Sequence, residues 1–220
     1  MTSEHKQKSE LPKNEMVEVS VASERAEAVG GVLIAFFAAL MAISQMVNGE
    51  LEEEMMIAHN KVVNYSSWYQ SKSIKESLKE SELDYLQALL NTGMVVEDKQ
   101  ASILEQVEET KGLIQKYGAE KFEILEGSAN IPKTQWVQDL DGELGKIVGV
   151  KEWEQLADDY DNATKRFDLG MLFFQISIVL GAVCIIIYDN PKLQKSFITL
   201  MIVFGIVGIV MSIYGYMLAP

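Results

Sequence analysis

The chain has 220 residues, of which 48% are hydrophobic, and it carries a formal net charge of −13. This acidic balance argues against nucleic acid and anionic lipid headgroups as partners, because both require basic patches. Cys184 is the single cysteine, which excludes an intrachain disulfide.

Three long uncharged runs contain much of the hydrophobic content. Residues 28–47, 169–188 and 197–219 hold no Asp, Glu, Lys, Arg or His. About 20 helical residues cross a hydrocarbon core roughly 30 Å thick, and a helix buried in a soluble domain rarely stays uncharged on every face for that length. We therefore predict three transmembrane helices, preceded by a disordered polar tail over residues 1–27.

The first apolar run is expected to be a retained anchor. Signal peptides have an apolar region of roughly 7–15 residues followed by a small-residue cleavage site. Here the run is longer, follows a tail of mixed charge, and ends in Met46-Val47-Asn48-Gly49-Glu50 without an A-x-A-like site.

An acidic region over residues 48–168 separates the first run from the second. It holds 13 Lys and Arg against 25 Asp and Glu, a balance of −12. Apolar residues spaced alternately by four and three predict a coiled-coil-like helix that opens at Leu51, is interrupted at residues 70–73 and resumes in another register. The first part of this stripe comprises Leu51, Met55, Ala58, Val62, Tyr65 and Tyr69, and the resumed part comprises Ile74, Leu78, Tyr85 and Leu89.

A second helix is predicted after a stop at Asn91-Thr92-Gly93, where the glycine can supply a left-handed cap. It ends at the break Gly127-Ser128-Ala129-Asn130-Ile131-Pro132. Residues 134–149 are ambiguous and suggest a short amphipathic helix interrupted by glycines. The second helix carries the same four-three spacing at Ile103, Val107, Thr110, Ile114, Tyr117, Lys121 and Ile124.

The last part of the acidic region continues into the second apolar run. One stripe from Trp153 to Phe174 predicts a single helix from about Lys151 to Tyr188, roughly 57 Å long. The short connection at residues 189–195 requires the second and third runs to form an antiparallel hairpin. The predicted fold class is an all-α integral membrane protein with three transmembrane helices and a long coiled-coil-like extramembrane region between the first and second.

Basic residues near the ends of the runs bear on orientation. Arg25 precedes the first run, and Lys192 and Lys195 lie in the connection between the second and third, on the same side of the membrane. Lys165 and Arg166 oppose them at the start of the second run. Because positive charge prefers the cytoplasm, we expect a cytoplasmic N-terminus and a periplasmic 48–168 region.

No catalytic or metal-binding arrangement can be assembled from the sequence. His5 lies in the tail and His59 on a polar helical face, and neither belongs to a spacing that binds metal. The consecutive acids of Glu50–Glu54 point around a helix axis and are expected to form a charged N-terminal turn. The sequence therefore predicts no enzyme activity and no cofactor.

Small residues four apart predict close helix packing, either within one chain or between chains. The amide of Gln175, about one-third of the way into the second run, is expected to make an interhelical hydrogen bond. A pore built by oligomerisation near this amide remains an alternative. The small residues are Gly31, Ala35, Ala39, Ser177, Gly181, Gly208 and Ser212.

The segment from Trp68 to Lys75 combines aromatic side chains with lysines. Packing against a neighbouring helix and recognition of a partner both remain open for it. The candidate interaction residues of the whole chain are Trp68, Tyr69, Gln70, Lys72, Lys75, Trp153, Tyr160 and Gln175.

This segment, W-Y-Q-S-K-S-I-K, resembles the W-x-Y-Q-A-K-S-I-K type signature of a bacterial membrane family, number 4337 among the domains of unknown function. The chain lacks the residue between Trp and Tyr and has Ser71 where alanine is usual. The stretch from Tyr160 through Asp168 into Phe174-Gln175-Ile176-Ser177 is also similar to that family's entry into its second span. The resemblance covers most of the chain after about residue 25. It implies a bacterial inner-membrane protein and supplies no activity or ligand.

Together these features favour a membrane-anchored structural or interaction protein with a helical hairpin as its interaction surface. It would be a homo-oligomer or an accessory subunit of a membrane complex. The expected partners are the lipid bilayer and either further copies or another membrane protein. A small oligomeric channel or transporter component is the alternative function.

Overall fold

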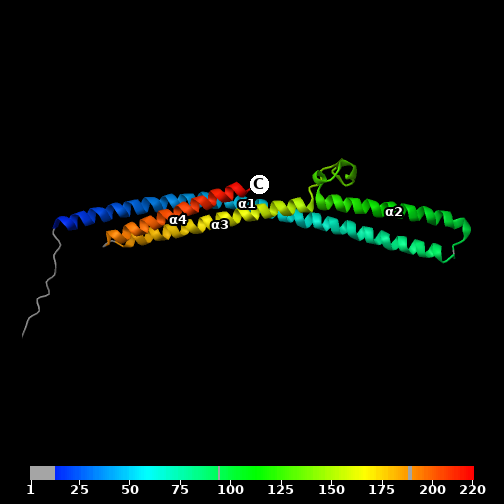
Figure 1. Cartoon of the computed structure of the whole chain (residues 1–220), viewed down its shortest axis with the longest axis horizontal. Helices are drawn as coiled ribbons and strands as arrows, with labels where there is room; N and C mark the ends of the chain where they lie inside the picture. The colour runs from blue at the N-terminus through cyan, green and yellow to red at the C-terminus, as the bar shows by residue number, and fades with distance from the viewer. Residues whose placement is uncertain (1–12, 94, 188–189) are drawn as a thin grey trace, which may run out of the picture. The chain divides into compact units, whose positions relative to one another are not determined.

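A computed structural model describes residues 13–93, 95–187 and 190–220 of the chain. Its helices confirm the all-α class, and three of them are long and apolar enough to cross a membrane (Figure 1). The helices are α1 (Lys13–Asn91), α2 (Glu97–Glu126), α3 (Val150–Ile186) and α4 (Pro191–Leu218). Between α2 and α3 lie the 3-10 turns Ser128–Asn130 and Lys133–Gln135 and the strands β1 (Asp139–Leu140) and β2 (Glu143–Leu144).

Helix α1 is uninterrupted from Lys13 to Asn91. It begins inside the segment predicted as a tail, of which residues 1–12 lie outside the described residues. The helix expected to open at Leu51 is therefore a continuation, and Glu50–Glu54 lies within α1, which corrects the prediction of an N-terminal turn. Gly49 is the residue there that disfavours a helix most, at a cost of about 1 kcal/mol, and the flanking residues outweigh it.

The predicted helix boundaries are largely confirmed. Helix α1 ends at Asn91 ahead of Gly93 (φ 67°), and α2 ends at Glu126 ahead of Gly127 (φ 88°). Glycine adopts these left-handed conformations without the steric cost of a Cβ. Helix α3 confirms the long continuous helix expected from about Lys151, although Tyr188, its predicted end, lies outside the described residues.

The chain divides into two compact units, which are described separately. The bundle unit comprises the chain up to Glu52 together with Asp161–Ala219, and the hairpin unit comprises Glu53–Tyr160. In the bundle unit, Phe37 of α1, Phe174 of α3 and Met201 of α4 form a buried core. The rings of Phe37 and Phe174 stack with their centroids 6.2 Å apart.

Helices α3 and α4 run antiparallel in the bundle unit, as predicted (Figure 1). The Ser177 hydroxyl donates to the Met201 carbonyl at 3.1 Å, and the Cys184 thiol lies 3.6 Å from the Gln194 carbonyl. Asn190 caps the start of α4 by accepting a hydrogen bond from the Leu193 N–H.

In the hairpin unit, the later part of α1 lies antiparallel to α2 (Figure 1). One stripe of α1, the inner stripe, is buried or half-buried at every position and keeps the register that starts at Leu51. The predicted change of register is wrong, because Ile74, Leu78 and Tyr85 are 62%, 64% and 66% exposed. Beyond Val62 the inner stripe comprises Tyr65, Tyr69, Lys72, Glu76, Lys79, Leu83, Leu86 and Leu90.

The segment between α2 and α3 is not the short helix predicted for residues 134–149. A 3-10 turn is followed by a two-stranded antiparallel ladder in which Asp139 pairs with Leu144 and Leu140 with Glu143. Asp141 (φ 54°) and Gly142 (φ 84°) form the turn between the strands, and Asp-Gly is a preferred pair for such tight hairpins. The glycines therefore fix turns instead of interrupting a helix.

Candidate functional site

Two ion pairs lie in the seam between α1 and α2. The Lys72 ammonium and the Glu120 carboxylate are 2.6 Å apart, and their side chains are only 13% and 5% exposed. Lys121 pairs with Glu76 from the opposite helix, again with both side chains largely buried. Both partners of a half-buried ion pair lose hydration. If α1 and α2 shifted along each other, these charges would be buried without a partner of opposite charge. These pairs therefore favour a single alignment of the hairpin.

Aromatic rings flank the ion pairs. The Lys72 ammonium lies 5.9 Å from the centre of the Tyr117 ring, and Lys121 lies 5.7 Å from that of Tyr69. Such cation–π contacts stabilise partly desolvated cations. Gly118 lies beside this cluster, where an added Cβ would lie 3.2 Å from a carboxylate oxygen of Glu76.

The structure separates the residues of the Trp68–Lys75 segment. Tyr69 and Lys72 belong to the seam, whereas Gln70 and Lys75 are exposed. Trp68 is half-buried, and its ring packs edge-on against Tyr65 at 5.7 Å. Part of the segment thus packs inside the hairpin unit. A role in partner recognition remains a prediction, and only the exposed side chains, Gln70 and Lys75, are available for it.

Trp153 of α3 packs on the same part of α1. Its ring lies 6.4 Å from Tyr65 and 6.0 Å from the Lys61 ammonium. Burial raises the pKa of the Tyr65 hydroxyl. Tyr160, the other aromatic candidate on α3, is half-buried.

A fully buried carboxylate organises the segment between α2 and α3. Glu123 is 0% exposed and accepts hydrogen bonds from the Ser128 hydroxyl at 2.7 Å and from the Val137 and Gln138 amides at 2.8 Å each. The Ser128 hydroxyl in turn accepts from the Ile147 amide at 3.0 Å. This network uses the carboxylate to hold the loop, so Glu123 is a structural residue that the sequence analysis missed.

Glycines allow the same segment to fold tightly. An added Cβ on Gly145 would lie 2.4 Å from the ring of Trp136, and one on Gly149 would lie 2.3 Å from the Gly127 amide nitrogen. The Trp136 indole N–H donates to the Ser128 carbonyl at 2.8 Å. Close backbone approach and positive φ values, which favour glycine, explain why these positions lack side chains.

The small residues predicted to pack helices fall into two groups. On α3 and α4 they are tightly covered, since an added Cβ on Gly181 would lie 2.6 Å from Ile34 and one on Gly208 would lie 2.8 Å from Phe174. The Ser212 hydroxyl accepts a 3.3 Å hydrogen bond from the Ser44 hydroxyl of α1, and Ser177 is fully buried. On α1, by contrast, Gly31 has nothing within 4 Å of an added Cβ, and Ala35 and Ala39 are exposed.

Gln175 lies on the exposed face of α3 and not among the helices of the bundle unit. Within the described residues Gln175 has no neighbouring helix on that face, so the expected interhelical hydrogen bond remains a prediction for a contact between chains. Its outward neighbours one turn away, Leu172 and Val179, are 48% and 61% exposed and apolar. The amide is thus presented to whatever surrounds the bundle.

Polar side chains meet at the end of the bundle unit nearest residue 48. Asn48 is 3% exposed, and its amide donates to Glu52 at 2.9 Å and to Asp168 at 3.2 Å. The contact joins α1 to α3 where the uncharged runs of both helices end. It marks the level at which the bundle changes from apolar to polar.

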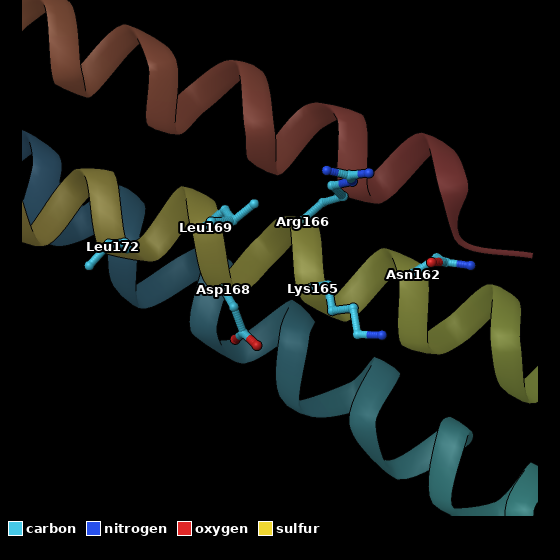
Figure 2. Close-up of a pocket in the computed structure, with 6 residues that line it drawn as sticks. All are labelled: Asn162, Lys165, Arg166, Asp168, Leu169 and Leu172. Atoms are coloured by element: carbon cyan, nitrogen blue, oxygen red, sulfur yellow. The ribbon is translucent and has the colours of Figure 1, made fainter.

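A groove of about 510 Å³ lies on α3 at the same level (Figure 2). Its charged side chains have partners in the bundle unit. Lys165 is 2.5 Å from Asp161, and the Arg166 guanidinium lies 5.5 Å from the centre of the Tyr214 ring. Figure 2 shows Arg166 directed toward α4 and Asp168 toward α1. The groove is lined by Asn162, Lys165, Arg166, Asp168, Leu169 and Leu172.

Within the residues that the structure describes, no group of His, Cys, Asp or Glu could hold a metal ion. His59 is exposed on α1, and His5 lies outside those residues. The titratable clusters described above are ion pairs and a loop-holding carboxylate. Their geometry favours a structural role.

Three apolar helices packed as a bundle, joined to a helical hairpin, define a small all-helical protein of membrane-protein composition. The chain belongs to the family described as Domain of unknown function (DUF4337), whose model matches residues 26–218. The match confirms the resemblance carried by the Trp68–Lys75 segment. No curated protein and no solved structure matches the chain.

Proposed function

We propose that this protein is a membrane-anchored structural or interaction protein that self-associates. Its three apolar helices would cross the bilayer and hold the hairpin unit in water. This assignment rests on composition for the membrane and on outward-facing side chains for the association. The assembled copies would act as a homo-oligomer or as an accessory part of a larger membrane complex.

The outward position of Gln175 is the observation that carries the proposal. Hydrocarbon offers no hydrogen-bond partner, so an amide facing lipid is costly. Gln175 lies six positions after Leu169, which places it roughly 9 Å along the span. A second copy would satisfy both its donor and its acceptor, because the same amide on the other chain offers the complementary groups.

We expect Gln175→Leu to weaken self-association roughly 3- to 30-fold, which corresponds to the 0.6–2 kcal/mol of an interhelical hydrogen bond in lipid. The measurement is the mass of the complex in mild detergent across a dilution series, with co-purifying proteins identified. Gln175→Asn retains an amide and should largely retain the complex. Gln45→Leu, the same change at an exposed amide near the end of the first run, should have no effect.

The same outward amide also suits the alternative of a channel component. A ring of copies with Gln175 facing a common axis would line a polar path. Flux through protein-containing vesicles that disappears in Gln175→Leu would support a channel. If the vesicles remain impermeable while the complex stays assembled, the channel alternative is rejected and the structural or interaction role is retained.

For the compartment, we propose a bacterial inner membrane with the N-terminus in the cytoplasm and the hairpin unit in the periplasm. Arg25, Lys192 and Lys195 then lie on the cytoplasmic side, which positive charge prefers. Lys75 is exposed, so Lys75→Cys should react with a membrane-impermeant maleimide in intact spheroplasts. Labelling only after lysis would place the hairpin unit in the cytoplasm instead.

A further inference from the structure

A second four-three stripe runs along α1 in the hairpin unit, and every position of it is exposed. Each member follows a residue of the inner stripe by two positions, which places it about 200° around the helix and hence on the side away from α2. We call it the outer stripe. It comprises Ser67, Ser71, Ile74, Leu78, Ser81, Tyr85 and Ala88.

The outer stripe differs in chemistry from an ordinary solvated helix face. None of its residues is charged, although the 48–168 region holds 25 Asp and Glu. The exposed side of α2 shows the usual alternative, with Glu105, Glu108 and Glu109 all in solvent. An uncharged stripe in a strongly acidic region lacks the charges that would keep two such surfaces apart.

The stripe contains both apolar contacts and small residues. Ile74, Leu78 and Tyr85 are 62%, 64% and 66% exposed, so they present three large apolar side chains at coiled-coil spacing, with Ser81 between the last two. Ser81 donates its hydroxyl to the Ser77 carbonyl of its own helix at 2.9 Å, which satisfies this group without water. Small, internally bonded residues allow a second helix to approach closely.

We propose that the outer stripe is the contact between two copies of this chain, packed as a parallel coiled coil of α1 against α1. This inference rests on the proposed self-association and names its surface outside the membrane. Identical residues meet across the two-fold axis of a parallel pair, so Ile74 meets Ile74 and Leu78 meets Leu78. Two copies anchored in one bilayer begin α1 on the same side, which selects the parallel direction and raises their effective concentration.

The residues beside the outer stripe are compatible with this register. In a parallel pair, side chains that flank the seam meet partners five positions further along the other chain. Gln70 then faces Lys75 of the second copy, and Ser77 faces Glu82. Asp84 faces Leu89. No flanking contact brings like charges together, so the acidic hairpins can approach on this face.

Disulfide crosslinking in the membrane tests the register in the full-length chain. With Cys184→Ser to remove the native thiol, Leu78→Cys and Ile74→Cys should each form a disulfide-linked dimer under mild oxidation. Glu80→Cys is the matched control, because Glu80 is also exposed but lies about 200° away from Leu78. We expect the yield of disulfide-linked dimer at position 80 to be at least about tenfold lower than at position 78, a ratio that corresponds to about 1.4 kcal/mol.

Equal yields at positions 78 and 80 would overturn the proposal. A second test mixes chains that carry Ile74→Cys with chains that carry Tyr85→Cys. The proposal would also fail if position 74 linked to position 85 more readily than to position 74 of another copy, since that pattern requires antiparallel helices. Leu78→Glu should abolish the link at position 74 while leaving the helical content unchanged, because position 78 is exposed in the single chain.

The mass of the complex separates this inference from the proposed function on which it rests. A dimeric mass without crosslinks along the outer stripe would reject the stripe and leave self-association intact. A monomeric mass together with the absence of crosslinks would reject both. A dimeric mass with strong links at 74 and 78 supports both.

Discussion

Replacing Glu123 with alanine is expected to lower the unfolding free energy of the hairpin unit by at least about 3 kcal/mol. The carboxylate is 0% exposed and accepts from the Ser128 hydroxyl and from the Val137 and Gln138 amides. Alanine would leave these buried donors without an acceptor, and each such group costs about 1–3 kcal/mol.

Urea denaturation and hydrogen exchange measure this effect together. Amide protons of Val137 and Gln138 should lose most of their protection in Glu123→Ala, while amides in the seam lose less. Glu105→Ala removes an exposed carboxylate from the same helix and should change stability by less than about 0.5 kcal/mol. If the two variants were equally stable, the loop would not depend on the buried carboxylate.

Gly205→Ala is expected to destabilise the bundle unit by about 1–3 kcal/mol, the usual cost of overpacking. An added Cβ would lie 2.0 Å from the ring of Phe37, and that ring is itself buried at 3% exposure. Helices α1 and α4 would therefore have to separate. In the bilayer proposed for the bundle unit, helix association would depend on close packing, so the hydrophobic effect would not compensate for the lost contacts.

Gly31→Ala provides the matched control in the same bundle. Nothing lies within 4 Å of a Cβ added at Gly31, so alanine should stabilise the helix by up to about 1 kcal/mol. The measurement is thermal unfolding in detergent, followed by circular dichroism. The midpoint temperature of unfolding should be lower for Gly205→Ala than for the unaltered chain, and it should not be lower for Gly31→Ala. A lower midpoint for Gly31→Ala would show that this face is already in close contact with another helix.

The sequence predicted the features that depend on one helix at a time. The uncharged runs identified the apolar parts of α1, α3 and α4. A helix in a soluble domain rarely stays uncharged on every face over such a length. Gly93 and Gly127 marked helix ends because a left-handed residue stops the helix. Short-range chemistry is sufficient for both inferences.

The seam of the hairpin could not be read from apolar residues alone. Lys72, Glu76 and Lys79 hold three successive seam positions, so a search for apolar side chains followed Ile74 and Leu78 onto the opposite face. A charged seam is acceptable only because Lys72 pairs with Glu120, 48 residues away, and Glu76 pairs with Lys121. The four-three spacing through Lys72 and Glu76 was present in the sequence and would have given the correct register.

The loop between α2 and α3 carried a usable signal that the helical pattern obscured. Asp141-Gly142 between Leu140 and Glu143 is a strong indication of a tight hairpin. The role of Glu123 had no such signal, because its donors come from residues 5–15 positions away in an irregular segment. The side of α3 that carries Gln175 likewise depends on how three helices pack, which a single-helix pattern does not determine.

Counting the copies in a lipid bilayer tests the central claim most directly. Chains carrying one fluorophore each, reconstituted at low density in vesicles, should bleach in two steps at a frequency far above that expected from random co-occupancy. The double variant Gln175→Leu/Leu78→Glu should bleach in one step, because it removes both proposed contacts. Single-step bleaching of the unaltered chain at every density would contradict self-association and with it the function proposed for this protein.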